Sequence, residues 1–452
     1  MKIIIIGDGK VGYKLAKQLS KEEYDIVLID NNAKKLREAT DQLDISCVTG
    51  DGCSVQIQQE ANVPDADLVI ACTSTDECNM LSCLIAKRLG AKHTIARVRN
   101  PIYYNQIDIL KEDLHLSMTV NPEFVVATEI SRLLIFPDAN KIETFMKGKV
   151  ELIEFPLFKE SQFIGLSLSD IYKKFHIRMV VCVAERGEDV FIPDGDYVCA
   201  VGDKIHMVVS RADLKKFFKA HGYHKTKIKN VLICGGGRVS VYLGLRLCDL
   251  GMHVKIIEIN EDRCEALCDI LPKATIIHGD ANSQDLLVEE GVHSADAFVA
   301  LTGMDEENII MSLYAKSQGV SKIIVKVNED RRARMIEDFG LDSIVSAKSA
   351  TADVIQSYVR GHKNTQSSAN VETLYHLVDD RVEAMEFIIK SQADYTDIPL
   401  SKLEIKSNNL IACIARGVEI IIPSGDDEIQ VGDRVMIITM EKHIQDLKDI
   451  MV

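Results

Sequence analysis

The chain has 452 residues, of which 46% are hydrophobic and 27% charged, and its formal net charge is −15. Because one hydrophobic core seldom grows past about 250–300 residues, this length predicts at least two domains. The acidic balance, a low aromatic content and the lack of tryptophan argue against nucleic-acid binding. No apolar run reaches the roughly 20 residues of a spanning helix, so we expect a protein made in the cytosol without direct membrane insertion.

The first segment alternates short β-branched runs with stretches of helical periodicity. Strands that alternate with helices predict right-handed βαβ crossovers and a parallel sheet covered on both faces. We therefore expect residues 1–135 to form a Rossmann-like, doubly wound α/β domain. Its strand candidates are residues 2–6, 25–29, 45–48, 67–71, 94–98 and 116–119.

A different pattern follows over residues 140–225, where short alternating runs lead to the turn sequences IPDGD at 192–196 and VGDKI at 201–205. Proline and glycine at such positions are typical of hairpin turns. We expect a small α+β module here, too small to hold a large catalytic cleft.

The chain then repeats itself, because NVLICGGGRVSVYLGLRL at 230–247 matches KIIIIGDGKVGYKLAKQL at 2–19, and the turn sequences return as IPSGD at 422–426 and VGDRV at 431–435. A register this long indicates a duplicated unit. It predicts a second Rossmann-like domain over residues 228–360 and a second small α+β module over 370–452. The polar stretch 360–371 is expected to be a linker between them.

The loop after the first strand matches the dinucleotide-binding pattern G-x-G-x-x-G. In this pattern the first glycine permits a tight turn, the second lets the backbone approach phosphate oxygens, and the third lets the helix pack closely. The positive end of the helix dipole then faces the phosphates. Asp30, at the end of the second strand, can accept hydrogen bonds from both ribose hydroxyls and would repel a 2′-phosphate, which favours NAD(H) over NADP. The loop residues are Gly7, Asp8, Gly9, Lys10, Val11 and Gly12.

The second copy matches this pattern less closely, because Ser240 stands where the first copy has its third glycine. Serine is small, so close packing of the helix can survive. Glu258 takes the place of Asp30 and its longer side chain can still reach a ribose. We expect a second nucleotide site here, with a degenerate loop that only packs as the alternative. The loop residues proposed as ligand contacts are Gly235, Gly237, Arg238 and Val239.

Further candidates lie at the carboxyl ends of later strands, where ligands bind in open parallel sheets. Asp51 is expected near an adenine ring, with a plain turn as an equal alternative. Thr73 follows the fourth strand, and Arg97 ends the fifth, where it could reach a phosphate or pair with a surface carboxylate. Their counterparts in the second copy are Asp280, Thr302 and Lys326.

No catalytic apparatus accompanies these loops in the sequence. A hydride-transfer enzyme needs an acid or base beside the nicotinamide, and we find no His–Asp pairing, Tyr-x-x-x-Lys arrangement or cysteine nucleophile in a recognisable setting. None of the 12 histidines clusters with carboxylates at ligand spacing, so no metal site is expected. The pattern favours a nucleotide sensor, with an NAD-dependent oxidoreductase as the alternative.

The glycine loop, the acidic residue that ends the second strand, VTGDG at 48–52, ARVRNP at 96–101 and VNPE at 120–123 resemble the regulatory subunits of Trk-type bacterial potassium-uptake systems. In that family the Rossmann-like units are called RCK N-terminal domains and the small modules RCK C-terminal domains. The resemblance implies nucleotide contacts for Gly7, Gly9, Gly12, Asp30, Asp51, Thr73 and Arg97. It also implies that Glu123 lies near an interface between nucleotide domains.

The same resemblance implies a role in transport. The protein would lie on the cytoplasmic face of the cell membrane as a peripheral protein and bind NAD(H) and ATP or ADP. It would gate a membrane potassium-translocating subunit of the TrkH or TrkG type, as a homo-oligomeric ring that we expect to be a tetramer of chains. Which nucleotide activates, and whether both sites bind the same ligand, stay open at this point.

Overall fold

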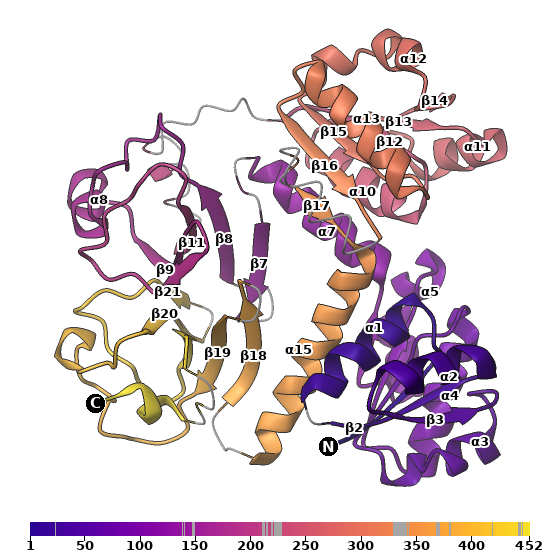
Figure 1. The fold of residues 1–452 in the computed structure, drawn as a ribbon, viewed down its shortest axis with the longest axis horizontal. Helices are drawn as coiled ribbons and strands as arrows, with labels where there is room; N and C mark the ends of the chain where they lie inside the picture. Colours follow the sequence, from indigo (N-terminus) through magenta and orange to yellow (C-terminus); the bar gives the residue numbers. More distant parts are fainter. Residues whose placement is uncertain are drawn as a thin grey trace.

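Within its described residues the chain forms two parallel and two antiparallel sheets, in the alternating order that the sequence predicts (Figure 1). No helix in this part of the chain combines the length and the apolar character that a membrane span requires. The computed structural model describes all residues except 23, 138, 140, 147–149, 210–212, 214, 215, 218, 219, 221–227, 329–340, 342, 368–370, 379, 380, 418, 442, 443 and 445.

The first Rossmann-like domain has one parallel sheet with the strand order β3-β2-β1-β4-β5-β6. Its strands are β1 (Lys2–Ile6), β2 (Asp25–Asp30), β3 (Ser46–Thr49), β4 (Leu68–Ala71), β5 (His93–Arg97) and β6 (Met118–Val120). Its helices are α1 (Lys10–Leu19), α2 (Ala33–Gln42), α3 (Val55–Glu60), α4 (Asp76–Leu89), α5 (Pro101–Asn105) and α6 (Ile107–Asp113). The isoleucines of β1 are buried on both faces of the sheet, which explains why this strand is a continuous apolar run.

The second Rossmann-like domain repeats this topology, with the strand order β14-β13-β12-β15-β16-β17. Its strands are β12 (Asn230–Cys234), β13 (His253–Glu258), β14 (Thr275–His278), β15 (Ala297–Ala300), β16 (Lys322–Lys326) and β17 (Ile344–Val345). Its helices are α10 (Arg238–Asp249), α11 (Glu261–Ile270), α12 (Gln284–Glu289) and α13 (Asp305–Ser317). The duplication read from the sequence is therefore confirmed at the level of the fold.

Each Rossmann-like domain is followed by an antiparallel sheet, which we call the first and second accessory modules. The first has the order β10-β9-β11-β8-β7 and the second β18-β19-β22-β20-β21. The first contains β7 (Lys141–Phe145), β8 (Val150–Pro156), α8 (Leu168–Phe175), β9 (Met179–Arg186), β10 (Asp189–Phe191) and β11 (Lys204–Val209). The second contains β18 (Val371–Leu377), β19 (Val382–Ile388), β20 (Asn409–Arg416), β21 (Glu419–Ile421) and β22 (Arg434–Thr439). Short 3-10 turns lie at Ser20–Glu22, Val63–Asp65, Val292–Ser294, Leu400–Lys402 and Leu447–Ile450.

The prediction that IPDGD at 192–196 marks a hairpin turn was wrong. The segment lies between β10 and β11, and these strands are not neighbours, because β9 lies between them in the sheet. The proline and glycine therefore shape a connection that crosses one strand. Composition alone predicts a turn at such a position but not which strands the turn joins.

Two helices are exchanged between the halves of the chain (Figure 1). Helix α7 (Pro122–Ile135) follows the first sheet but packs against α10 of the second Rossmann-like domain. Helix α15 (Ala347–Ser367) follows the second sheet but packs against α1 and β6 of the first. The prediction of a polar linker over residues 360–371 was wrong for residues 360–367, because α15 continues to Ser367.

The buried side chains confirm this exchange. Ala352, Ile355 and Val359 of α15 belong to the same core cluster as the strands and α1 of the first domain. Val126 and Ile130 of α7 lie in a cluster that includes the sheet of the second domain. Apolar side chains of α7 are thus covered by the second half of the same chain.

The two accessory modules also share a core. Val150, Leu152 and Val208 of the first module pack in one buried cluster with residues of the second, among them Val382 and Ala412. The four units therefore interlock in pairs: parallel sheet with parallel sheet through exchanged helices, and accessory module with accessory module through their sheet faces.

We expect Ile355→Ala to destabilise the first Rossmann-like domain, although Ile355 lies in the second half of the sequence. The side chain is 1% exposed, and truncating a buried isoleucine costs about 2–5 kcal/mol. Pulse proteolysis of the whole chain in a urea gradient should show cleavage within residues 2–120 at lower urea than in the unmodified chain.

The matched control is Leu250→Ala, because Leu250 is 47% exposed and its loss should stay within about 0.5 kcal/mol. If Ile355→Ala made cleavage easier only between residues 230 and 345, this result would contradict the exchange of helices.

Candidate nucleotide-binding site

The first glycine loop runs from the end of β1 to the start of α1, and each of its glycines has a different constraint. Gly7 has a φ of +106°, and a Cβ there would lie 2.9 Å from the backbone nitrogen of Thr73. A Cβ on Gly12 would lie 1.9 Å from the carbonyl oxygen of Gly7. A Cβ on Gly9 would meet no atom within 4 Å. The turn and the close packing predicted for the first and third glycines are therefore present, and Gly9 faces open space.

Helix α1 begins without a side-chain cap, since its N-cap residue is Gly9. The first N–H groups of a helix have no partner within the helix and lie at the positive end of its dipole. An anion placed over Gly9 can accept hydrogen bonds from these groups, and the absence of a Cβ lets it approach the backbone. The loop therefore fits a phosphate group.

Asp30 holds the loop in place through its carboxylate. Its Oδ2 accepts a hydrogen bond from the N–H of Asp8 at 2.7 Å, and its Oδ1 accepts one from the N–H of Asn32 at 2.8 Å. Asp8 is buried beside it, and both burial and the charge of Asp30 raise the pKa of the Asp8 carboxyl. The carboxylate of Asp30 thus orients the loop and keeps further lone pairs for a ribose.

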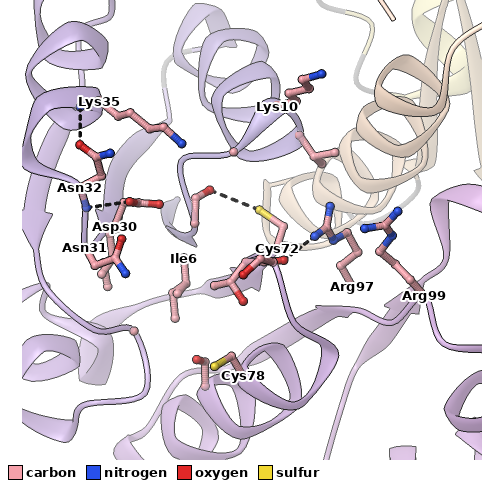
Figure 2. Close-up of a pocket in the computed structure, with 18 of the residues that line it drawn as sticks. Ile6, Lys10, Asp30, Asn31, Asn32, Lys35, Cys72, Cys78, Arg97 and Arg99 are labelled. Carbon is pink, nitrogen blue, oxygen red and sulfur yellow. Dashed lines mark hydrogen bonds between the residues drawn. The ribbon is translucent and has the colours of Figure 1, made fainter. Parts of the chain in front are cut away.

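The loop opens into a cavity of about 610 Å³, a volume within the usual range for small-molecule sites (Figure 2). Its wall contains the sequence-predicted residues Gly7, Gly9, Lys10, Val11, Asp30, Asp51, Thr73 and Arg97. Asp8 and Gly12 are not part of that wall. Asn328, Ala347 and Lys348 also line the cavity, so the second half of the chain contributes to the first site.

Asn79, fully buried on α4, links two of the predicted residues. Its side-chain oxygen accepts hydrogen bonds from the N–H and the hydroxyl of Thr73, both at 2.7 Å. Its amide nitrogen donates to the carbonyl oxygen of Arg97 at 2.9 Å. Asn79 is not among the site residues predicted from the sequence, although an asparagine recurs at the matching position of the second copy, Asn308, and that recurrence was the signal that could have found it.

Arg97 is a cation with an unused donor. Its guanidinium donates to the carbonyl oxygen of Thr73, while its buried Nε has no hydrogen-bond partner among the described residues. Burial is the largest cause that lowers the pKa of Arg97, because removing water disfavours the charged form. A buried donor without a partner costs free energy that an anionic ligand in the cavity would recover.

Asp51 lies in the wall of the cavity, and its Oδ1 accepts a hydrogen bond from the N–H of Cys53 at 2.9 Å. This contact closes a local turn, as the alternative of a plain turn at Asp51 predicted. The position at the end of β3 is also the one predicted for contact with an adenine ring.

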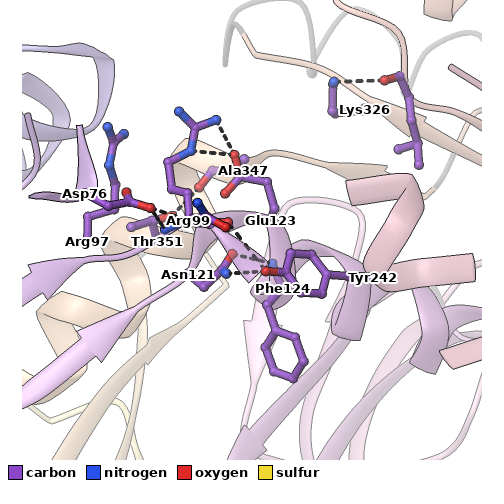
Figure 3. A network of polar contacts seen from close by, with 12 residues as sticks. Asp76, Arg97, Arg99, Asn121, Glu123, Phe124, Tyr242, Lys326, Ala347 and Thr351 are labelled. Carbon is purple, nitrogen blue, oxygen red and sulfur yellow. Dashed lines mark hydrogen bonds and ion pairs between the residues drawn. The ribbon is translucent and has the colours of Figure 1, made fainter. Parts of the chain in front are cut away.

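A polar network joins this cavity to the second Rossmann-like domain (Figure 3). Glu123 accepts a hydrogen bond from Nε of Arg99 at 2.7 Å, and its second carboxylate oxygen is buried without a partner among the described residues. Asn121, two residues earlier, donates to the hydroxyl of Tyr242 on α10 at 2.9 Å. Glu123 thus lies where the two Rossmann-like domains meet.

The second loop keeps the geometry of the first. Gly235 has a φ of +97°, and Glu258 accepts hydrogen bonds from the N–H groups of Gly236 at 2.6 Å and Asn260 at 2.9 Å, as Asp30 does in the first copy. A Cβ on Gly237, the equivalent of Gly9, would meet no atom within 4 Å. The hydroxyl of Ser240 donates to the carbonyl oxygen of Gly235, so the extra side chain is accommodated.

The polar groups around the second loop are already engaged. Nε of Arg263 donates to the carbonyl oxygen of Gly236 at 2.8 Å, which brings a cation over the loop. Lys326 donates to the carbonyl oxygen of Leu301 at 3.1 Å, and burial lowers its pKa. Thr302 bonds to Asn308 as Thr73 does to Asn79, and Asp280 accepts from the N–H of Asn282 at 2.9 Å.

Two Rossmann-like domains with glycine loops, each followed by a small antiparallel module, define a duplicated RCK-type protein. The family model of the TrkA-N domain matches residues 3–122 and 231–347, and the model of the TrkA-C domain matches residues 152–222. The Trk system potassium uptake protein TrkA homolog 1 of Methanosarcina mazei is 33% identical over 97% of this chain and 97% of its own length. The chain belongs to the TrkA family of Trk potassium-uptake proteins.

Other relatives agree with this assignment. The Trk system potassium uptake protein TrkA of Halomonas elongata is 31% identical over 98% of this chain and 96% of its own length. Among solved structures, the GsuK channel bound to NAD has a TM-score of 0.65 at 16% identity and covers 97% of this chain and 76% of its own. The GsuK RCK domain has a TM-score of 0.63 at the same identity, and covers 97% of this chain and 92% of its own. At this identity the likeness shows a shared fold.

We expect Gly9→Ala and Gly12→Ala to have different effects on stability. The added methyl at Gly12 would collide with the backbone of Gly7, and overpacking of this kind costs about 1–3 kcal/mol. The methyl at Gly9 would point into open space. Thermal unfolding of the ligand-free protein should show a lower Tm for Gly12→Ala and a Tm close to that of the unmodified protein for Gly9→Ala. Equal losses in both variants would contradict this description of the loop.

Proposed function

We propose that this chain is the regulatory subunit of a Trk-type potassium-uptake system, and that NAD(H), ATP or ADP bound to it gates a membrane potassium-translocating subunit of the TrkH or TrkG type. The observation that carries the proposal is the cavity over the first glycine loop, because both halves of the chain form its wall. The names of the relatives support the transport system, and the solved GsuK complexes with NAD and with ADP support the ligand class.

Each group of a nucleotide has a matching feature in the first site. Phosphates fit over Gly9, against the start of α1 and within reach of the unused donor of Arg97. The ribose fits the carboxylate of Asp30, and the adenine fits the end of β3 near Asp51. At the second loop, Gly235, Gly237, Arg238, Val239 and Glu258 are proposed to hold a nucleotide in the same way, with Asp280 and Thr302 at its rim.

Binding becomes regulation because the site lies between two domains. A nucleotide that contacts the first loop and also the start of α15 binds more tightly to one relative placement of the domains than to another, and only this difference can shift the equilibrium. With a tenfold preference at each of two sites, the bias per chain is about 2.7 kcal/mol. That is enough to move a balanced two-state gate almost fully to one side.

Two surface features support assembly into a ring on the cytoplasmic face of the membrane. Ile102 and Ile109, on the consecutive helices α5 and α6, are 65% and 70% exposed and could be buried in an interface between chains. The net charge of −15 disfavours direct contact with anionic lipid. We therefore propose a homo-oligomer, a tetramer of chains, that is held at the membrane by its protein partner.

The oxidoreductase alternative finds less support. Among the described residues that line the first cavity there is no histidine or tyrosine that could serve as an acid or base. Burial raises the pKa of the Cys72 thiol to about 12, so this cysteine is protonated at neutral pH and a poor nucleophile. We propose that the chain binds nucleotides without turning them over.

We expect Asp30→Ala to weaken binding of NADH and ATP at the first site about tenfold to a hundredfold, because charge-assisted hydrogen bonds contribute about 1.5–3 kcal/mol. Isothermal titration calorimetry on the full chain measures this loss. Glu258→Ala, the matching change in the second copy, should leave the affinity of the first site unchanged. Unaltered affinity in Asp30→Ala would show that the nucleotide binds elsewhere.

Asp30→Asn separates ribose recognition from the support of the loop. The amide keeps one acceptor oxygen but removes the charge that repels a 2′-phosphate, so the ratio of NADPH affinity to NADH affinity should rise. If Asp30 only orients the loop, both affinities should fall together and the ratio should stay constant.

The proposed assembly predicts the behaviour of the purified protein. Multi-angle light scattering at micromolar concentration should give the mass of an oligomer, and a monomer alone would rule out the ring. In vesicle flotation, binding should require vesicles that contain the potassium-translocating subunit. Equally tight binding to protein-free anionic vesicles would refute docking through a partner.

A further inference from the structure

A cluster of three potential metal ligands lies in the first accessory module, far from the nucleotide cavity in the sequence. It consists of Glu154 on β8, Glu185 on β9 and His206 on β11, and one ligand atom from each lies within 4.8 Å of the others. Nε2 of His206 is 2.6 Å from Oε1 of Glu185. Because β9, β11 and β8 are neighbours in the sheet, and His206 lies directly opposite Glu154, paired strands hold all three residues.

The cluster is mostly removed from water. His206 is 6% exposed, and the side chain of Glu185 is 16% exposed. Side chains alternate along a strand, so His206 points to the same face of the sheet as Val208, and Glu154 to the same face as Leu152. Val208 and Leu152 belong to the core shared with the second accessory module, which places the cluster at the seam between the modules.

The second accessory module provides an internal comparison. Strands β22 and β19 pair Met436 with Glu386, as β11 and β8 pair His206 with Glu154. Ala415 stands opposite Arg434, as Glu185 stands opposite Lys204. Both modules form the same sheet, so the fold itself does not require a histidine and a second carboxylate at these two positions.

The charged residues at these matching positions also differ between the two modules. In the second module one carboxylate remains, and Glu386 forms an ion pair with Arg434 at 3.0 Å. In the first module two carboxylates and an imidazole converge. The first module therefore offers three metal-ligating side chains where the second keeps one carboxylate.

Basic residues also lie near the cluster. Lys204 stands opposite Glu185 on the paired strand, and Lys141 of β7 stands opposite Glu154. The guanidinium of Arg381 donates to the backbone oxygen of Glu188 at 2.6 Å. The sheet nevertheless brings the three ligand atoms of Glu154, Glu185 and His206 together.

We propose that Glu154, Glu185 and His206 bind a divalent first-row transition-metal ion, with Zn²⁺ as the ion that best fits one imidazole and two carboxylates. Bond lengths of about 2.0–2.2 Å in a tetrahedral site place the ligand atoms about 3.3–3.6 Å from one another. Nε2 of His206 and Oε1 of Glu185, now 2.6 Å apart, would therefore separate slightly, which side-chain rotation allows. The imidazole disfavours Mg²⁺ and Ca²⁺, which prefer oxygen ligands. Three protein ligands leave one position for water.

The test uses the full chain in nucleotide-free, metal-free buffer, with Co²⁺ as the spectroscopic probe for the Zn²⁺ site. We expect one Co²⁺ per chain at this site, with visible ligand-field absorption, no thiolate charge-transfer band, and displacement by Zn²⁺. His206→Met and Glu185→Ala introduce the residues found in the second module, which keeps the sheet foldable. Each should weaken this binding tenfold or more. Zn²⁺ should raise the Tm of the unmodified protein but not of these variants.

His253→Met is the matched control, because His253 is exposed on β13 of the second Rossmann-like domain. It should leave the absorption and the affinity unchanged. Equal affinity in His206→Met and the unmodified protein, or a thiolate band in place of the expected spectrum, would overturn the proposal. If circular dichroism shows that His206→Met does not fold, the affinity of Glu185→Ala and of Glu154→Gln decides the question by the same criterion.

Discussion

The exchange of α7 and α15 between the two Rossmann-like domains is the contact that determines where the candidate nucleotide site lies. Burying a large aliphatic side chain contributes about 1.5–3 kcal/mol, and α15 places Ile355 and Val359 in the core of the opposite domain. Separating the domains would expose these side chains to water. The start of α15 is consequently fixed beside the first glycine loop, and the second half of the chain becomes part of the first site.

This arrangement gives the cavity a means to sense the relative position of the domains. The loop and Asp30 belong to the first domain, while Ala347 and Lys348 come from the connection that leaves the second. The contact of Asn121 with Tyr242 crosses the same junction. A ligand that spans these parts is therefore sensitive to a movement that leaves each sheet intact, which is what a regulatory subunit requires.

Local sequence signals were sufficient to predict the parallel sheets and many of the residues that line the first cavity. Strand periodicity, the glycine spacing and an acidic residue after the second strand all depend on near neighbours in the chain, and the structure agrees with each. The exchange could not be predicted, because helical periodicity shows that α7 has an apolar face but not which surface covers it. The polar composition of 360–371 likewise suggested a linker where the chain is helical as far as Ser367.

Contacts between distant residues explain the remaining differences. The His206 cluster has no spacing motif, because its members lie on three strands that only the sheet brings together. The two copies keep the same hydrogen bond between a threonine and a buried asparagine, yet they differ in the cation beside it, Arg97 or Lys326. A duplicated fold with different charges at matching positions allows the two halves to respond to different ligands.

Hydrogen–deuterium exchange of the unmodified protein, with and without ATP or NADH, tests most directly whether nucleotide binding engages both halves of the chain. The account predicts that amide exchange slows together in the loop at residues 7–12 and at the start of α15, residues 347–351, because both line one cavity. Slower exchange in the loop with no change at the start of α15 would contradict a site shared between the domains.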